Sequence, residues 1–184
     1  VCTLSAEAGT LTWDSVGSTI YTNQRGDRQL QTTYADSARI LITTHRLLDE
    51  WTQPDTLPRN INFTRDQRSP YILNDGVTLY FAANDSNGLG GLDIYVSRYN
   101  IATENYTTPE NLGFPYNSPG NEYLFVLDET RQIGYLATDR FAGEGRVHVY
   151  SFAIPEQKEY WRNIAIDSLI AYARLEQFKI LATD

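Results

Sequence analysis

The sequence has few of the residues that bind metal ions or form disulfides. Its 184 residues include one cysteine, no methionine and two histidines. Because Cys2 has no second cysteine to pair with, an internal disulfide is excluded. A zinc site needs three or four ligands, and no Cys or His residues are spaced to complete one around His45 or His148. We therefore predict no metal site, and no cofactor is indicated.

Long apolar runs and clusters of positive charge are also missing. The mean hydropathy of −0.42 predicts no membrane-spanning segment. The net charge of −8, without clustered Lys or Arg, excludes nucleic acid as a partner, because affinity for phosphate backbones comes largely from such clusters.

Catalytic motifs are absent as well, and we predict that the chain is not an enzyme. No Gly-x-Ser-x-Gly elbow occurs. Residues 84–93 resemble a calcium loop, but Ala83 and Ile94 occupy two of the ligand positions, which excludes an EF-hand. We interpret this segment as a tight turn between strands, in which Asp93 accepts hydrogen bonds from backbone amides.

The sequence does contain an internal repeat. The segment TLYFAANDSNGLGGLDIYVS, which starts at Thr78, matches IGYLATDRFAGEGRVHVYSF, which starts at Ile133, without a gap. We call the fixed spacing from Thr78 to Ile133 the repeat offset. A more diverged copy lies upstream, where residues 17–21 match 76–80 and residues 51–57 match 106–112. Repeats of this length, built from short strands and polar turns, are typical of propeller blades and other stacked β units.

One copy has the pattern of a four-stranded antiparallel sheet. Residues 71–73 and 77–81 form a predicted hairpin around the turn Asn74-Asp75-Gly76. After a glycine-rich connection, residues 92–98 read as a third strand, and residues 106–112 supply a short fourth. Four short strands per copy is the blade pattern of a propeller.

The predicted fold is therefore an all-β, propeller-like array of about three blades, followed by a helical segment. The β repeats cover residues 1–155, with approximate blades at 10–57, 69–112 and 121–154. After Pro155, residues 156–184 are rich in helix formers, as one long helix or two shorter ones. We expect this segment to cover the β repeats, with Trp161 and Tyr172 buried against them.

The second copy also carries a family resemblance. The segments SPYILNDGVTLYFAANDSNGLGGLDIYVSRYN, from Ser69, and PENLGFPYNSPGNEY, from Pro109, resemble the PD40 repeat. This is a WD40-like propeller motif that also occurs in TolB-type proteins, and the form here is similar to that of Bacteroidetes cell-envelope proteins. The resemblance implies a propeller-like β fold with a binding or scaffolding role, and no particular reaction.

We accordingly expect a non-enzymatic binding or scaffolding module of an exported bacterial envelope protein, periplasmic or associated with the outer membrane, with a protein or glycan partner. The alternatives are a propeller domain of a larger envelope peptidase or glycan-degrading enzyme, and a purely structural spacer. Cys2 is either a lipid-bearing cysteine or an ordinary residue of a strand or truncated segment.

The repeat alignment also suggests where a ligand would bind. It matches Asn84 with Asp139 and Asp85 with Arg140, each pair following an equivalent strand. Propeller ligands usually meet loops at one face, so these four residues are the predicted ligand-face residues, and their two loops should lie on the same face.

Overall fold

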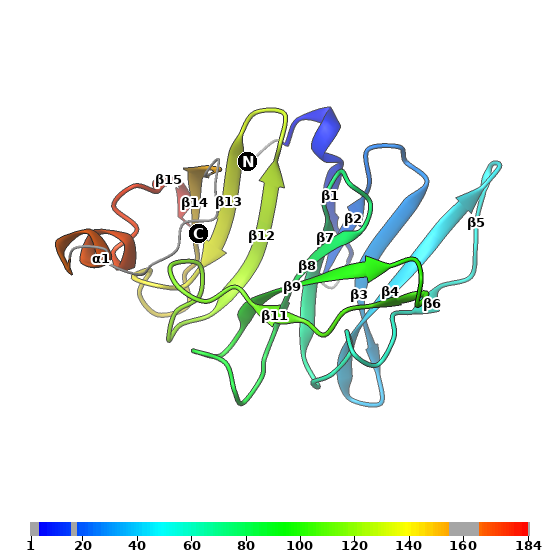
Figure 1. Cartoon of the computed structure of the whole chain (residues 1–184), viewed down its shortest axis with the longest axis horizontal. Coiled ribbons are helices and arrows are strands. Elements are labelled where there is room, and N and C mark those ends of the chain that lie inside the picture. Colours follow the sequence, from blue (N-terminus) through cyan, green and yellow to red (C-terminus); the bar gives the residue numbers. More distant parts are fainter. Residues whose placement is uncertain (1–3, 16–17, 155–165, 184) are drawn as a thin grey trace.

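The chain folds into three antiparallel β-sheets arranged in series, as seen in a computed structural model that describes residues 4–15, 18–154 and 166–183 (Figure 1). A 3-10 turn at Ala6–Ala8 precedes the first sheet, and one helix, α1, spans Ile166–Ala173. The prediction of a mostly β fold is confirmed. Within the described residues, no helix is long and apolar enough to cross a membrane.

Sheet 1 is built from the first six strands. Four of them pair antiparallel in chain order, and the two-residue strands β5 and β6 both pair with β4. The bounds are β1 Thr10–Trp13, β2 Thr19–Thr22, β3 Arg28–Ala35, β4 Ala38–Leu47, β5 Glu50–Trp51 and β6 Asp55–Thr56.

Sheets 2 and 3 follow in the same manner. In sheet 2, β7, β8 and β9 pair in order, and the two short strands β10 and β11 both pair with β9. Sheet 3 has the order β12, β13, β14, β15. The bounds are β7 Gln67–Ile72, β8 Thr78–Ala83, β9 Asp93–Asn100, β10 Asn105–Tyr106, β11 Glu110–Asn111, β12 Glu122–Asp128, β13 Ile133–Thr138, β14 His148–Ala153 and β15 Lys179–Thr183.

The sequence repeat is visible in the strands themselves. The first three strands of sheet 2 and of sheet 3 begin at positions separated by the repeat offset, namely Gln67 and Glu122, Thr78 and Ile133, and Asp93 and His148. The predicted hairpin at Gly76 is also present, because β7 and β8 pair antiparallel on either side of it. The alignment of the second and third copies is therefore confirmed.

The alignment of the first copy is right at its end and wrong at its beginning. Strands β5 and β6 pair with β4 as β10 and β11 pair with β9, so β4 corresponds to β9. Strand β2 lies two strands before β4 and thus corresponds to β7, whereas the sequence matched it to β8. The spacing differs because a tight turn at Asp36 and Ser37, both with positive φ, replaces the long loop at residues 84–92. Strand β1 is an additional strand at the edge of sheet 1.

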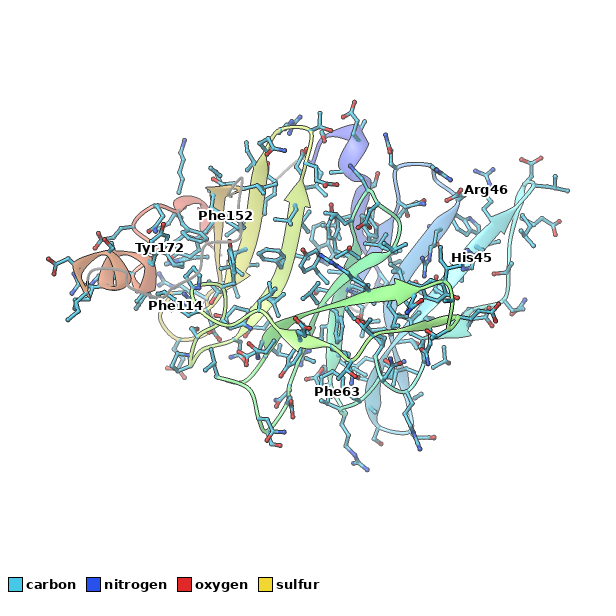
Figure 2. The ribbon with its side chains drawn as sticks, viewed as in Figure 1. His45, Arg46, Phe63, Phe114, Phe152 and Tyr172 are labelled. Atoms are coloured by element: carbon cyan, nitrogen blue, oxygen red, sulfur yellow. The ribbon has the colours of Figure 1, made fainter. Side chains whose placement is uncertain are left out.

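The end of the chain departs from the predicted helical segment at residues 156–184. Of residues 166–183, only those of α1 are helical, and Lys179–Thr183 form strand β15, which pairs with β14 as the fourth strand of sheet 3. Phe178 packs its ring 4.8 Å from that of Phe152, which Figure 2 labels on sheet 3, and so anchors the strand to the core.

The apolar side chains of helix α1 whose burial the structure describes are not buried as expected. Ile166 and Ile170 are exposed, and Tyr172 is only half-buried. Trp161 lies outside the described residues. The edge of sheet 3 is instead extended by β15, since Leu175, with a positive φ and a buried side chain, redirects the chain after the helix.

Two tyrosine hydroxyls join the three sheets through the equivalent strands β2, β7 and β12, which we call the inner strands. Tyr21 on β2 donates to the carbonyl oxygen of Ile72 on β7 at 2.9 Å, and Tyr71 on β7 donates to that of Leu127 on β12 at 2.6 Å. The two acceptors are separated by the repeat offset and are therefore equivalent. The two rings meet edge to face at 4.8 Å within the core shared by the sheets.

Two asparagines fix the linkers between the sheets. Asn62 accepts from the backbone N–H of Leu41 at 2.7 Å and donates to its carbonyl at 3.0 Å. Asn117, the equivalent residue in the next copy, brackets the backbone of Ile94 in the same way, at 2.8 and 2.9 Å. Each linker thus binds back to the sheet that it leaves, which sets the position of the next sheet.

Replacing Gly76 tests the hairpin of sheet 2. Gly76 has a φ of +71°, and an added Cβ would meet no atom within 4 Å, so Gly76→Ala should introduce backbone strain without a clash. We expect a loss of about 1 kcal/mol, or a fall of roughly 2–4 °C in melting temperature. Gly76→Asn, which tolerates this conformation better, is the matched control and should lose less. Equal melting temperatures for wild type and Gly76→Ala would contradict the turn.

Candidate functional site

The two predicted ligand loops lie at the same end of neighbouring sheets. Asn84 and Asp139, which begin the loops, donate their backbone N–H groups to the carbonyls of Asp66 and Asn121, which are also equivalent in the repeat. The first loop reaches the next linker, where Gly91 donates to Gly120 at 3.0 Å. We call residues 84–92 and 139–147 together the loop face.

The first loop is folded around two aspartates. The carboxylate of Asp85 accepts from the Tyr95 hydroxyl at 3.2 Å, and Asn84 is exposed beside it. Asp93, buried at the end of the loop, accepts from the backbone N–H of Leu89 and from the Asn111 side chain. The interpretation of Asp93 as a turn residue bound to backbone amides is therefore confirmed.

Asp139 holds the second loop to the linker before it. Its carboxylate accepts from the backbone and side-chain amides of Asn121, both at 2.7 Å, and from the Tyr123 hydroxyl at 3.1 Å. Burial alone would raise the pKa of Asp139, but these hydrogen bonds outweigh it and lower the pKa. Asn121 in turn accepts from the backbone of Leu92, which connects the two loops.

Arg140 is not available to a ligand, contrary to its assignment to the ligand face. The residue is 8% exposed, and its guanidinium donates to the carbonyls of Pro115 and Tyr116 and to the carboxylate of Glu122 at 3.0 Å. It therefore fixes the linker between sheets 2 and 3. The sequence alone could not distinguish this position from an exposed arginine in a polar loop.

Glu122 is the buried partner of Arg140, and the sequence analysis missed it. It also accepts from Ser118 and Thr138. Burial raises the pKa of Glu122, and the hydrogen bonds and the charge of Arg140 offset only part of that effect. In sheet 2 the equivalent residue is the neutral Gln67, and an aspartate, Asp85, stands in the place of Arg140. At this pair of positions the buried acid and the buried base appear together, because an unpaired buried charge is costly.

The exposed part of the loop face carries two large apolar side chains. Leu89 is 54% exposed in the first loop, and Phe141 is 66% exposed in the second. Phe141 also has a φ of +62°, which is unusual for an aromatic residue. The same two loops also carry exposed polar residues, namely Asn84, Ser86, Asn87, Glu144 and Arg146. Sequence reasoning missed both apolar residues because it compared only the polar ones.

The charged groups that are buried or half-buried at this site, namely Asp93, Glu122, Asp139 and Arg140, hold the structure together. Among the residues that the structure describes, no group of three or more His, Cys, Asp or Glu side chains could hold a metal ion. His45 is exposed on sheet 1 (Figure 2), while His148 on sheet 3 lies 3.2 Å from the Tyr150 hydroxyl. Cys2 lies outside the described residues.

Comparison with known proteins gives no family for this chain. No family model matches it, and no curated protein matches it significantly. The resemblance to PD40 repeats therefore stays a prediction from the residues.

Asp139→Asn tests the network beneath the loop face. Asparagine has one acceptor oxygen where three donors converge, so we expect a loss of about 1–3 kcal/mol of unfolding free energy at pH 7. The lowered pKa means that Asp139 stabilises the fold above the ordinary aspartate value of 3.8, and that this contribution is lost as the pH falls below it. Urea unfolding at neutral and acidic pH should show the difference between wild type and variant shrinking in acid.

Glu144→Gln, a neutralisation of an exposed carboxylate in the same loop, is the control and should change stability little at either pH. An Asp139→Asn variant as stable as wild type at pH 7, or one with the same deficit at pH 3, would contradict the role given to this carboxylate.

Proposed function

We propose that this chain is a non-enzymatic binding module that docks a protein partner on its loop face. The main observation in support is that Leu89 and Phe141 are exposed on two loops that are joined to each other through Asn121. Large apolar side chains rimmed by polar groups are typical of protein–protein contact sites. Aromatic residues in particular provide much of the binding energy at such sites.

The support beneath the loops favours recognition by a preformed surface. Asp93 and Asn121 accept hydrogen bonds from the backbone of the first loop, and the Asp139 carboxylate ties the start of the second loop to the backbone of Asn121. A loop that is already ordered loses less conformational entropy on binding, which leaves more of the contact energy for affinity. The positive φ of Phe141 fits this view, because strained residues are retained where the surroundings hold them and often where function requires them.

The wider setting of the proposal rests on the repeat and its resemblance. We infer that the three sheets are successive blades of a PD40-type, propeller-like array in an exported bacterial envelope protein. Two features support the inference: equivalent strands of sheets 2 and 3 recur at the repeat offset, and equivalent inner strands are joined by tyrosine hydroxyls. A glycan partner is less favoured than a protein, because the large exposed side chains of the loop face, Leu89 and Phe141, are apolar.

Site-specific photocrosslinking tests the proposed surface. A photoreactive residue at position 89 should yield a specific adduct with one partner protein in the cell envelope, whereas the same residue at Thr130, exposed at the opposite end of sheet 3, should not. With the purified partner, Phe141→Ser should weaken binding by at least about tenfold, as expected for loss of an aromatic contact.

Ile101→Ser is the matched control, since Ile101 is 77% exposed at the other end of sheet 2. It should leave the affinity unchanged. Equal weakening by both substitutions, or crosslinking only from position 130, would refute the loop face as the binding surface.

A further inference from the structure

A pocket of about 250 Å³ lies at the end of the sheets opposite the loop face. It opens between two hairpin turns, residues 23–27 of sheet 1 and residues 73–77 of sheet 2. Its apolar part comes from Tyr21, Ile72 and Leu73, and the Tyr21 hydroxyl is already bonded to Ile72. The pocket shares no lining residue with the loop face.

Two arginines line this pocket in a protein of net charge −8. Arg28 donates to the hydroxyls of Thr43 at 3.2 Å and Tyr106 at 3.1 Å, both neutral groups that hold the guanidinium in place. Within the described residues, no carboxylate forms an ion pair with Arg25 or Arg28. The pocket therefore contains positive charge that its own direct contacts do not neutralise.

The one acidic residue that lines the pocket is turned toward its own hairpin. Asp75 accepts from the backbone N–H groups of Val77 and Thr78, both at 2.8 Å, and from the Thr78 hydroxyl. Burial would raise the pKa of Asp75, but these bonds, with a contribution from Arg98, lower it. Its carboxylate is thus engaged in capping the turn, and two arginines against this one aspartate leave the lining with a net positive charge.

The junction between sheets 2 and 3 shows which group suits this position. There the Glu129 carboxylate, on the turn of sheet 3, accepts from the backbone N–H of Asn74, on the turn of sheet 2, at 3.3 Å. The residue that precedes Glu129 by the repeat offset is Asn74 itself. Asn74 of sheet 2 is therefore the equivalent of Glu129 of sheet 3. At the junction of sheets 1 and 2, the neutral side-chain amide of Asn74 stands where the next junction has a carboxylate, and it lines the pocket with Arg25 and Arg28.

We propose that the pocket binds a small carboxylate, which lies beside the Asn74 side chain, supplies the negative charge that Glu129 supplies at the next junction, and pairs with Arg25 and Arg28. Guanidinium groups pair strongly with carboxylates, often through two parallel hydrogen bonds. The volume is below the roughly 300–1,000 Å³ of sites for drug-sized ligands, which suits a small acid. The carboxylate belongs either to a free acid such as a sugar acid or to the terminus of a peptide.

NMR titration of the full chain tests the proposal with probes of both sources. The two carboxylates are glucuronate and N-acetyl-trialanine, and their neutral counterparts are glucose and N-acetyl-trialanine carboxamide. At roughly 150 mM salt, where exposed charges are screened, at least one carboxylate should saturably shift the amide signals of Gly26 and Gly76. Its neutral counterpart should not, and the carboxylate that binds identifies the source.

Arg25→Gln should weaken that binding about tenfold, because it removes a charged partner of the ligand. Arg25 is exposed, so the fold should be unaffected; Arg28→Gln, checked for folding by its spectrum, should weaken binding similarly. Arg59→Gln changes the net charge equally at an exposed site and should leave the affinity unchanged. Any one of four results would overturn the assignment: no shifts with either carboxylate, equal shifts with the neutral probes, equal weakening by Arg59→Gln, or binding of inorganic phosphate alone.

Discussion

The architecture depends on one kind of contact, a phenol hydroxyl that crosses from the inner strand of one sheet to a backbone carbonyl on the inner strand of the next. Strand β7 and strand β12 are edge strands of their sheets, and edge strands carry carbonyls without a ladder partner. Burying such a carbonyl requires a donor. Tyr21 and Tyr71 supply it while their rings fill the space between the sheets. The position equivalent to Tyr71 in sheet 3 is Val126, so this type of contact ends at sheet 3.

The arrangement of the two ends of the molecule follows from that stacking. Because equivalent strands lie side by side, the long loops after β8 and β13 meet at one end and the hairpin turns meet at the other. Small changes between copies then give each junction its own chemistry. Glu122 and Arg140 form a buried pair where sheet 2 has Gln67 and Asp85. At the opposite end, Glu129 at one junction is replaced by Asn74 at the other, which leaves arginines facing a pocket.

The sequence predicted the parts of the structure that local chemistry and the repeat determine. The hairpin at Gly76, the bond from Asp93 to its own turn and the strands recurring at the repeat offset were all readable, because turn residues and strand periodicity act over short distances. The strand match of the first copy was wrong, since a two-residue turn and an extra strand changed its spacing without changing its pattern. Strand β15 was missed because its residues read as helix formers and only pairing with β14 makes them a strand. The burial of Arg140 depends on Glu122 and on the linker, neither of which is near it in sequence.

Titration of the tyrosines tests the central contact most directly. Burial raises the pKa values of both Tyr21 and Tyr71 above the ordinary value of 10.0, so unfolding, which lets both phenols ionise, becomes more favourable as the pH rises past that value. Followed by carbon-13 NMR with each tyrosine assigned, the ring signals of Tyr21 and Tyr71 should stay those of the neutral phenol until the chain unfolds. Titration of either ring near pH 10 in a chain that is still folded would contradict the account, because a hydroxyl that ionises freely is not held in a bond between the sheets.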